Sequence, residues 1–296
     1  MKVSLLDQGV SFPAIGPYRS VKETLFLARR AEELGFERVW IAEHHESSNT
    51  CGAPEVLIAA IAQHTKIIRL GSGASLLPYY NPLRLATAFR LLEYLAPARI
   101  DLSIGRGQGA QTDIAERLGY ARGDYREQII MLRQELEYLT KDGYPEHEIA
   151  QLWLTGSSVD SAALAGDLSL PFCFAQFTNS DLRPEVVKTY RSRLSAGTTG
   201  YFGLGLHAIC AESQADLEAL RRMIGKFLPR LAGSGSGGAT IFGWSILVGS
   251  PTQMRDALGN LVDLYQPDEL FVTATCPDFQ LKLRSFELIA ELAAAL

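Results

Sequence analysis

The sequence lacks the features that mark several classes of protein. Its cysteines are far apart and form no Cys-x-x-Cys pair, so neither a zinc ribbon nor a redox dithiol is expected. No apolar run is long and charge-free enough to cross a membrane, and Met1–Val10 is too short and too polar for a signal peptide. We therefore expect a cytoplasmic protein with reduced cysteines. These cysteines are Cys51, Cys173, Cys210 and Cys276.

The sequence also lacks a strong excess of charge of either sign. It has 33 acidic and 28 basic residues, for a net charge of −5. This balance argues against nucleic acid or an anionic membrane as the main partner. Hydrophobic residues make up 47% and charged residues 21%, which is typical of a globular protein with a packed core.

Three catalytic or nucleotide-binding motifs are missing as well. No Gly-Lys-Ser/Thr follows the glycine-rich segment Gly105–Gly109, so that segment is not a P-loop. No helix carries His-Glu-x-x-His, and the adjacent His44 and His45 would point in opposite directions from an extended chain. We therefore expect no metal site. The segment from Gly71 to Ser75 lacks the last glycine of a nucleophile elbow, which argues against a serine hydrolase.

What is present is a regular alternation of short apolar runs with amphipathic segments. We expect strands at 3–6, 38–42, 67–71, 100–104, 152–155, 171–175, 204–211 and 269–274, with an extra strand at 241–248. We expect helices at 20–34, 53–64, 82–95, 124–140, 159–167, 184–194, 215–228, 251–264 and 281–296. The third strand is expected to break at Gly71–Gly73, where the backbone is permissive or closely approached.

Eight strands that alternate with helices in 296 residues predict a single (β/α)8 barrel over residues 1–296. A doubly wound open sheet is the alternative. It usually has a glycine-rich turn after its first strand, and the segment Asp7–Val10 does not provide one.

The segment Glu43-His44-His45 directly follows the buried strand Val39–Ile41. In parallel α/β folds, catalytic groups gather at the carboxyl ends of strands. Histidine is the side chain that titrates nearest to neutral pH. We therefore expect the chemistry here, although one histidine capping a loop and the other satisfied in the core is a simpler alternative.

Two further segments that follow strands are suited to binding phosphate. Arg106, in a glycine-rich turn, offers a planar set of donors. Ser157, Ser158 and Ser161 open a helix, where hydroxyls and free N–H groups bind anions, although taken alone ordinary N-capping by Ser157 or Ser158 is the simpler explanation. Since the two segments follow consecutive strands, we expect them to bind one phosphate together.

An ordered series of motifs runs along nearly the whole chain and is more specific than any one of them. It consists of Trp40–His45, Ala53–Ile58, Ile68–Gly73, Leu77–Pro82, Leu92–Asp101, Gly105–Gly107, Trp153–Ser158 and Pro267–Leu270. This series resembles the bacterial luciferase-like flavin monooxygenase family, and most of all its single-chain oxidoreductases.

The resemblance implies a (β/α)8 barrel that uses reduced FMN, delivered by a separate NAD(P)H:flavin reductase, and O2 to oxidise a small organic substrate. It implies that His44 is the active-site proton donor or acceptor and that Glu43 lies beside the flavin ring. It also implies a non-prolyl cis peptide at Gly73-Ala74 against the ring. The phosphate contacts that it implies are Arg106, Gln108, Ser157, Ser158 and Ser161.

The resemblance also implies partners and alternatives. Early helices of such barrels often form a homodimer, here Ala53–His64 and Pro82–Leu95. The connections Thr140–Leu152 and Leu231–Thr240 are expected to be shorter than in relatives. This shortening leaves a non-catalytic flavin-binding protein as an alternative function. A deazaflavin-dependent oxidoreductase of the same superfamily is a further alternative. Gly105 stands where luciferase has a cysteine, so light emission is not expected. The aromatic residues expected to line an apolar substrate site are Tyr79, Tyr80, Phe174, Phe177 and Trp244.

Overall fold

The structure is a computed structural model that describes residues 1–46, 49–107, 109, 111–120, 123–138, 150–227, 241–242 and 246–296. Gln108, Trp244, Leu231–Thr240 and most of Thr140–Leu152 therefore lie outside the described residues. The chain divides into two compact units. The N-terminal unit comprises Leu6–Glu32 and Glu37–Thr155, and the C-terminal unit comprises Met1–Leu5, Glu33–Phe36 and Gly156–Leu296.

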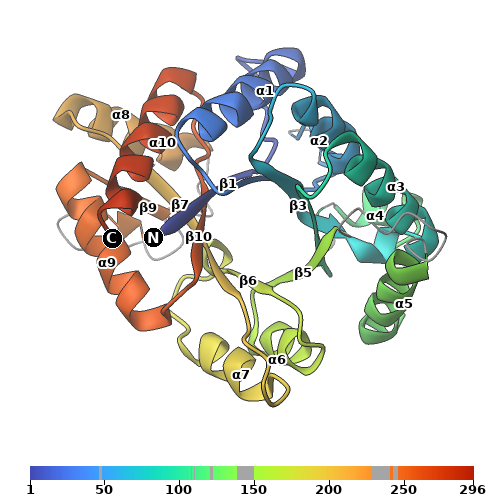
Figure 1. Ribbon diagram of the computed structural model, residues 1–296. Helices are drawn as coiled ribbons and strands as arrows, with labels where there is room; N and C mark the ends of the chain where they lie inside the picture. Colours follow the sequence, from blue (N-terminus) through green and yellow to red (C-terminus); the bar gives the residue numbers. More distant parts are fainter. Residues whose placement is uncertain are drawn as a thin grey trace. The chain divides into compact units, whose positions relative to one another are not determined.

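The N-terminal unit alternates parallel strands with helices. Its elements are α1 (Pro17–Glu33), β2 (Arg38–Ile41), α2 (Pro54–Ala62), β3 (Arg69–Leu76), the 3-10 turn η1 (Leu77–Tyr79), α3 (Pro82–Leu95), β4 (Ile100–Gly105), α4 (Thr112–Arg117), α5 (Tyr125–Tyr138) and β5 (Gln151–Gly156). β2 pairs with β3, β3 with β4, and β4 with β5, all in parallel. On the outer side of β3, α2 packs against α3, and α3 packs against α5 (Figure 1).

The third strand differs from the expectation. β3 does not break at Gly71–Gly73 but continues to Leu76, and its pairing with β4 shifts register between Ser72 and Ser75. The expected close approach is confirmed, because a Cβ at Gly71 would lie 2.5 Å from the carbonyl oxygen of Asp101. A Cβ at Gly73 would lie 2.7 Å from Leu6. The glycines let neighbouring strands approach rather than ending the strand.

The C-terminal unit has a similar alternation. Its elements are β1 (Lys2–Asp7), α6 (Val159–Asp167), β6 (Phe172–Ala175), the 3-10 turn η2 (Gln176–Thr178), α7 (Glu185–Arg193), β7 (Phe202–Cys210), α8 (Gln214–Phe227), β8 (Ile241–Phe242), β9 (Ile246–Gly249), α9 (Pro251–Tyr265), β10 (Glu269–Thr273) and α10 (Phe279–Ala294). β7, β10 and β1 lie side by side in parallel (Figure 1). The expected extra strand is present as β9 with its antiparallel partner β8.

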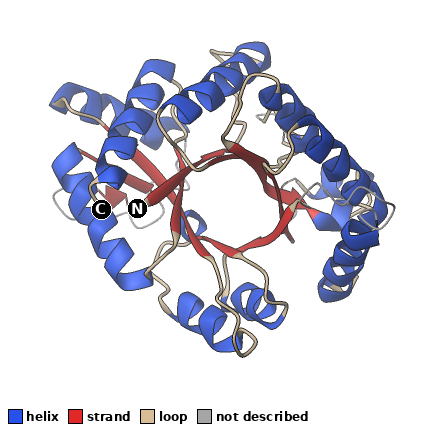
Figure 2. Cartoon of the chain, viewed as in Figure 1, coloured by secondary structure: helices blue, strands red, loops and turns tan. Residues whose placement is uncertain are grey.

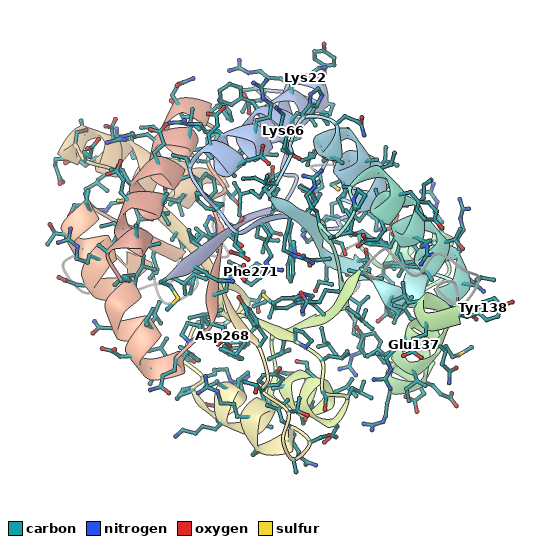
Figure 3. The ribbon with its side chains drawn as sticks, in the orientation of Figure 1. Lys22, Lys66, Glu137, Tyr138, Asp268 and Phe271 are labelled. Carbon is teal, nitrogen blue, oxygen red and sulfur yellow. The ribbon has the colours of Figure 1, made fainter. Side chains whose placement is uncertain are left out.

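The strand order is β10-β1-β2-β3-β4-β5-β6-β7, with a further pairing between β10 and β7. This order confirms the predicted (β/α)8 barrel topology. In each unit the strands form an inner layer that helices cover (Figure 2). Phe271 on β10 is fully buried and fills the space left by Gly203 on β7, whereas Tyr138 points outward from α5 (Figure 3).

A buried ion cluster joins the amino-terminal ends of β2, β3 and β4. Asp101 on β4 is fully buried and accepts hydrogen bonds from Arg38 Nη1 (2.8 Å) and Trp40 Nε1 (3.1 Å) on β2. Arg69 on β3 donates to its other carboxylate oxygen from Nε (3.1 Å) and Nη2 (2.5 Å). Because one carboxylate receives donors from two neighbouring strands, this cluster fixes their relative position.

All four cysteines are free and buried, as expected for reduced thiols. Burial raises the pKa of Cys51 and of Cys210 to about 12 and that of Cys276 to about 11. None of the helices in the described ranges is long and apolar enough to span a membrane.

Candidate active site

Glu43, immediately after β2, is a buried carboxylate with three donors. Its Oε2 accepts hydrogen bonds from the backbone N–H of Leu76 (2.8 Å) and the hydroxyl of Tyr80 (2.9 Å). Its Oε1 lies 2.6 Å from Nε2 of His45. Burial raises the pKa of Glu43, and the three donors oppose that rise. Glu43 thus ties the end of β2 to the end of β3 and to η1.

His44 is in a different environment. Its Nε2 lies 2.8 Å from Oε1 of Gln8, and its backbone N–H donates to the carbonyl of Cys51 (2.9 Å). Burial lowers the pKa of His44, and the carboxylate of Glu46 opposes that change. His44 is therefore a partly buried imidazole that is mostly neutral near pH 7, the form in which it accepts a proton.

His45 is the satisfied histidine of the pair. Besides its contact with Glu43, its backbone N–H donates to Gly109 (2.8 Å) and its ring packs edge-on against Tyr79, with centroids 5.4 Å apart. Gly52 leaves room for the ring, since a Cβ there would lie 3.0 Å from Nδ1 of His45. The simpler alternative of a satisfied histidine therefore describes His45, and the catalytic role of His44 stays a prediction. No group of three or more described His, Cys, Asp or Glu side chains is placed to hold a metal ion.

The predicted cis peptide is present between Gly73 and Ala74 on β3. The carbonyl of Ala74 accepts the backbone N–H of Glu43 (3.3 Å), so this peptide lies beside the end of β2. The next residue, Ser75, is fully buried, and its hydroxyl has no hydrogen-bond partner among the described residues. A hydroxyl in this position has an unused donor and acceptor.

Arg106 directly follows β4 and is exposed. Its carbonyl accepts the hydroxyl of Tyr120 (2.8 Å), and its guanidinium lies 6.0 Å from the ring centroid of Tyr125 at the start of α5. Tyr125 is only 9% exposed, and within the described ranges its hydroxyl has no hydrogen-bond partner. A Cβ at Gly107 would meet nothing within 4 Å. The end of β4 thus combines a cation, an unused hydroxyl and open backbone.

The predicted serines lie at the start of α6 in the C-terminal unit. Ser158 caps the helix by accepting the backbone N–H of Ser161 (3.2 Å), and the hydroxyl of Ser161 accepts the backbone N–H of Ser158 (3.1 Å). A Cβ at Gly156 would overlap the Ser161 side chain, so that glycine permits this capping box. The capping interpretation is therefore confirmed for Ser158, and Ser161 completes its capping box. The backbone carbonyl of Ser157 accepts from Asn179 Nδ2 (3.4 Å).

Several residues around these groups are absent from the sequence-based prediction. Gln8 directly follows Asp7 at the end of β1, so the rule about strand ends applied to it as well. Tyr120 lies in the connection after the unpredicted helix α4, and Tyr125 begins α5; no sequence signal marks either as a site residue. Tyr80 was expected only as an apolar lining residue, but it holds Glu43 through its hydroxyl.

With the site's geometry established, comparison with known proteins identifies the family. Residues 1–265 match the sequence profile of luciferase-like monooxygenases. The chain belongs to the luciferase-like monooxygenase family. The resemblance drawn from the motifs is thus confirmed.

Individual relatives agree with this assignment. N-acetyl-S-alkylcysteine monooxygenase of Bacillus subtilis (strain 168) is 32% identical over 74% of this chain and 70% of its own length. The crystal structure of apo-MsnO8 superposes with a TM-score of 0.87 at 32% identity, covering 100% of this chain and 98% of that one. The oxygenating constituent of 3,6-diketocamphane monooxygenase, solved with FMN, has a TM-score of 0.75 at 21% identity and covers 98% of its own chain and 100% of this one; it shows the shared fold.

Proposed function

We propose that this member of the family is a flavin-dependent monooxygenase that uses reduced FMN and O2 to oxidise a small organic substrate, with His44 as its proton-transfer residue. The observation that carries the proposal is the contrast between the two histidines. The ring of His45 contacts the Glu43 carboxylate and packs against Tyr79, whereas the partly buried imidazole of His44 contacts the neutral amide of Gln8 through Nε2. A neutral imidazole directly after Glu43, whose backbone N–H donates to the carbonyl of Ala74, suits general acid–base work.

The residues present fit a flavin. The unpartnered hydroxyl of Ser75 and the peptide at Gly73-Ala74 offer polar contacts where the ring would bind, next to Glu43. Arg106 and the unpartnered hydroxyl of Tyr125 offer a cation and a donor for its phosphate. When bound, reduced FMN would supply the electrons that activate O2.

We further propose that Gln108 and Ser157, Ser158 and Ser161 contribute to the phosphate contacts. The serine hydroxyls stand at the amino terminus of α6, where the helix dipole favours negative charge. Ser158 and Ser161 already hydrogen-bond to each other, so their hydroxyls would bind phosphate through their remaining lone pairs or after rotation. Backbone N–H groups would provide most of the hydrogen bonds to the phosphate.

The proposed contact between Tyr125 and the FMN phosphate can be tested with riboflavin as the control ligand. Tyr125→Phe is expected to weaken FMN binding about 10-fold, because a hydrogen bond to a charged group contributes roughly 1.5–3 kcal/mol. Flavin fluorescence quenching measures the affinity. Riboflavin, which lacks the phosphate, should bind the variant and the wild type equally, and Tyr138→Phe on the same helix should change neither affinity. Equal losses for FMN and riboflavin would contradict the phosphate role.

The reaction itself is tested by reconstitution. The full chain is mixed with an NAD(P)H:flavin reductase, FMN and isotopically labelled O2, and products are examined by mass spectrometry for labelled oxygen. An N-acetyl-S-alkylcysteine is the first probe, because it is the substrate in the name of a 32% identical relative. An aldehyde and a phenolic polyketide are the next two. Labelled product supports the proposal, and FMN binding without labelled product from any probe supports a non-catalytic binder. Hydride transfer with a deazaflavin in place of FMN would indicate the other alternative.

The proposed partners are the reductase, which supplies reduced FMN, and a second copy of this chain. Since the reductase draws on NAD(P)H and the four thiols are reduced, we place the reaction in the cytoplasm. For the homodimer, support comes from the outer side of α3, where exposed apolar residues recur at helical spacing. They are Leu83, Leu91, Tyr94 and Leu95, and exposed Val56 lies on the contacting helix α2.

A charge on this apolar stripe should separate the two copies. Leu91 is 58% exposed, and Leu91→Asp is expected to weaken dimerisation by 10-fold or more, since burying an unpaired charge in an interface costs at least about 1.4 kcal/mol. Sedimentation velocity over a concentration series measures the shift. Leu264→Asp, at an exposed position on α9, is the matched control and should remain dimeric. A wild-type protein that is monomeric throughout the series would refute the homodimer.

A further inference from the structure

Gln8 is the described side chain that holds the imidazole of His44. The carbonyl oxygen of its amide lies 2.8 Å from Nε2 of His44. An amide oxygen only accepts hydrogen bonds, so Nε2 must carry the proton in this arrangement. In the neutral ring, the lone pair then resides on Nδ1.

The backbone on both sides of Gln8 is anchored, which gives this contact a fixed geometry. Asp7 is buried and accepts hydrogen bonds from Thr24 Oγ1 (2.6 Å) and from the backbone N–H of Gly9 (3.1 Å). Its carbonyl accepts the backbone N–H of Ala42 (2.9 Å), just before the site segment. The residue before Gln8 is therefore tied to α1 and to the end of β2.

Gly9 anchors the other side. Its carbonyl accepts both the backbone N–H (2.7 Å) and the hydroxyl (3.0 Å) of Thr50. Its φ of +62° and the 2.9 Å between its missing Cβ position and Cys51 Cβ both require glycine. Cys51 in turn accepts the backbone N–H of His44. The loop of Gln8 and the segment of His44 are thus joined by a closed set of backbone contacts.

We propose that Gln8 is a positioning residue, whose amide oxygen fixes His44 as the Nε2–H tautomer so that Nδ1 is the atom that accepts and returns the reaction's proton. The proposal rests on the proposed monooxygenase function for its kinetic consequence, but the tautomer itself is a property of the protein alone. A neutral amide orients the ring without the strong pull of a carboxylate, so the imidazole keeps its unprotonated form near neutral pH.

The ionisable groups around His44 are consistent with this role. Glu46 and His45 lie on its own segment and act on its pKa in opposite directions, Glu46 raising it and His45 lowering it. Glu43 is engaged by three donors, and Asp7 by Thr24 and Gly9. The thiol of Cys51 is protonated, because its pKa is about 12. Gln8 is the described side chain in direct hydrogen-bond contact with the imidazole.

The test reads the tautomer directly. Long-range proton–nitrogen correlation spectra of the full chain distinguish Nε2–H from Nδ1–H for each of the five histidines, and His44→Asn assigns the signal. The wild type is expected to show Nε2–H at His44. Gln8→Leu, which keeps the size but removes the acceptor, is expected to show a mixture of tautomers. Gln8→Glu is expected to raise the pKa of His44 by about 1–3 units, since a carboxylate would then contact the ring.

Kinetics form the second readout. Gln8→Leu is expected to lower kcat on the order of 10-fold to 100-fold with little change in FMN affinity, as when an orienting partner of a functional histidine is lost. In Gln8→Glu the acidic limb of the pH profile should move to higher pH, because the neutral base then exists only above the raised pKa. Gln134→Leu on the exposed side of α5 is the matched control, and circular dichroism verifies folding.

The outcomes separate the two proposals. An Nδ1–H tautomer in the wild type, or an unchanged tautomer in Gln8→Leu, overturns the role of Gln8 whatever the enzyme's activity. The expected tautomers without labelled product from any probe would retain the role of Gln8 in orienting His44 and overturn the proposed oxygenation. If Gln8→Leu fails to fold, the pKa of His44 in Gln8→Glu still decides, and an unshifted titration overturns the proposal.

Discussion

His44→Ala is expected to lower kcat for substrate oxygenation by about 100-fold to 10,000-fold, the range for loss of a positioned acid–base residue. The imidazole is partly buried, is held through Nε2, and has no described partner at Nδ1, so no neighbouring group takes over its proton transfer. FMN affinity should be close to that of the wild type, because the proposed phosphate and ring contacts come from other residues. NAD(P)H would still be consumed, with the electrons released as hydrogen peroxide instead of product.

The comparison of product, peroxide and FMN affinity separates a chemical role from a structural one. His64→Ala, at an exposed position just after α2, is the control and should couple NAD(P)H to product as the wild type does. If His44→Ala turns over substrate at the wild-type rate, His44 is not the proton-transfer residue. If it loses FMN binding as well as product, its role is to build the site.

Asp101→Ala is expected to lower the free energy of unfolding by about 3–5 kcal/mol, the range for breaking a buried ion pair from one side. The change would leave the guanidinium of Arg38, whose side chain is only 4% exposed, without its carboxylate. It would also release Arg69 and the indole N–H of Trp40. Because all three donors sit at the start of β2 or β3, the loss affects the packing of three adjacent strands.

Thermal denaturation measures this loss, expected as a fall in Tm on the order of 10 °C for a domain of this size. Asp101→Asn, which keeps an acceptor oxygen, should lose less. Glu212→Ala removes one partner of Arg284 in a solvent-exposed pair, and should leave Tm unchanged because exposed pairs are screened by water and salt. A loss below about 1 kcal/mol for Asp101→Ala would mean that the cluster is replaceable by packing alone.

The fold was predictable from the sequence because its signals are local. Most of the eight barrel strands contain a short apolar run, and α3 begins and ends where Pro82 and Leu95 predicted. β3 was misjudged because glycine usually weakens a strand, whereas Gly71 and Gly73 here make room for Asp101, Trp40 and Leu6, which belong to other elements. That reason is tertiary and leaves no mark in the segment itself.

The site was predictable only in part, for the same reason. The rule about strand ends located Glu43, His44 and Arg106. It did not show which histidine contacts a carboxylate and which contacts a neutral amide. That difference depends on Gln8, about forty residues earlier in the chain, and on Tyr79 in a later turn. Tyr125 was not predicted as a site residue. Whether its hydroxyl has a hydrogen-bond partner becomes clear only when the positions of the neighbouring residues in the fold are known.

The buried thiols bear on the lifetime of the protein. An oxygenase whose flavin reacts without substrate releases hydrogen peroxide, and peroxide attacks the thiolate form of cysteine. Cys51 accepts the backbone N–H of His44 through its carbonyl, so this buried cysteine lies next to the segment that carries the proposed chemistry. With pKa values of about 12 for Cys51 and Cys210 and about 11 for Cys276, the thiolate is scarce at neutral pH. Thiols in this state would react slowly with peroxide released by the proposed reaction, and a single cysteine added at the surface would be the preferred site for a thiol-directed label.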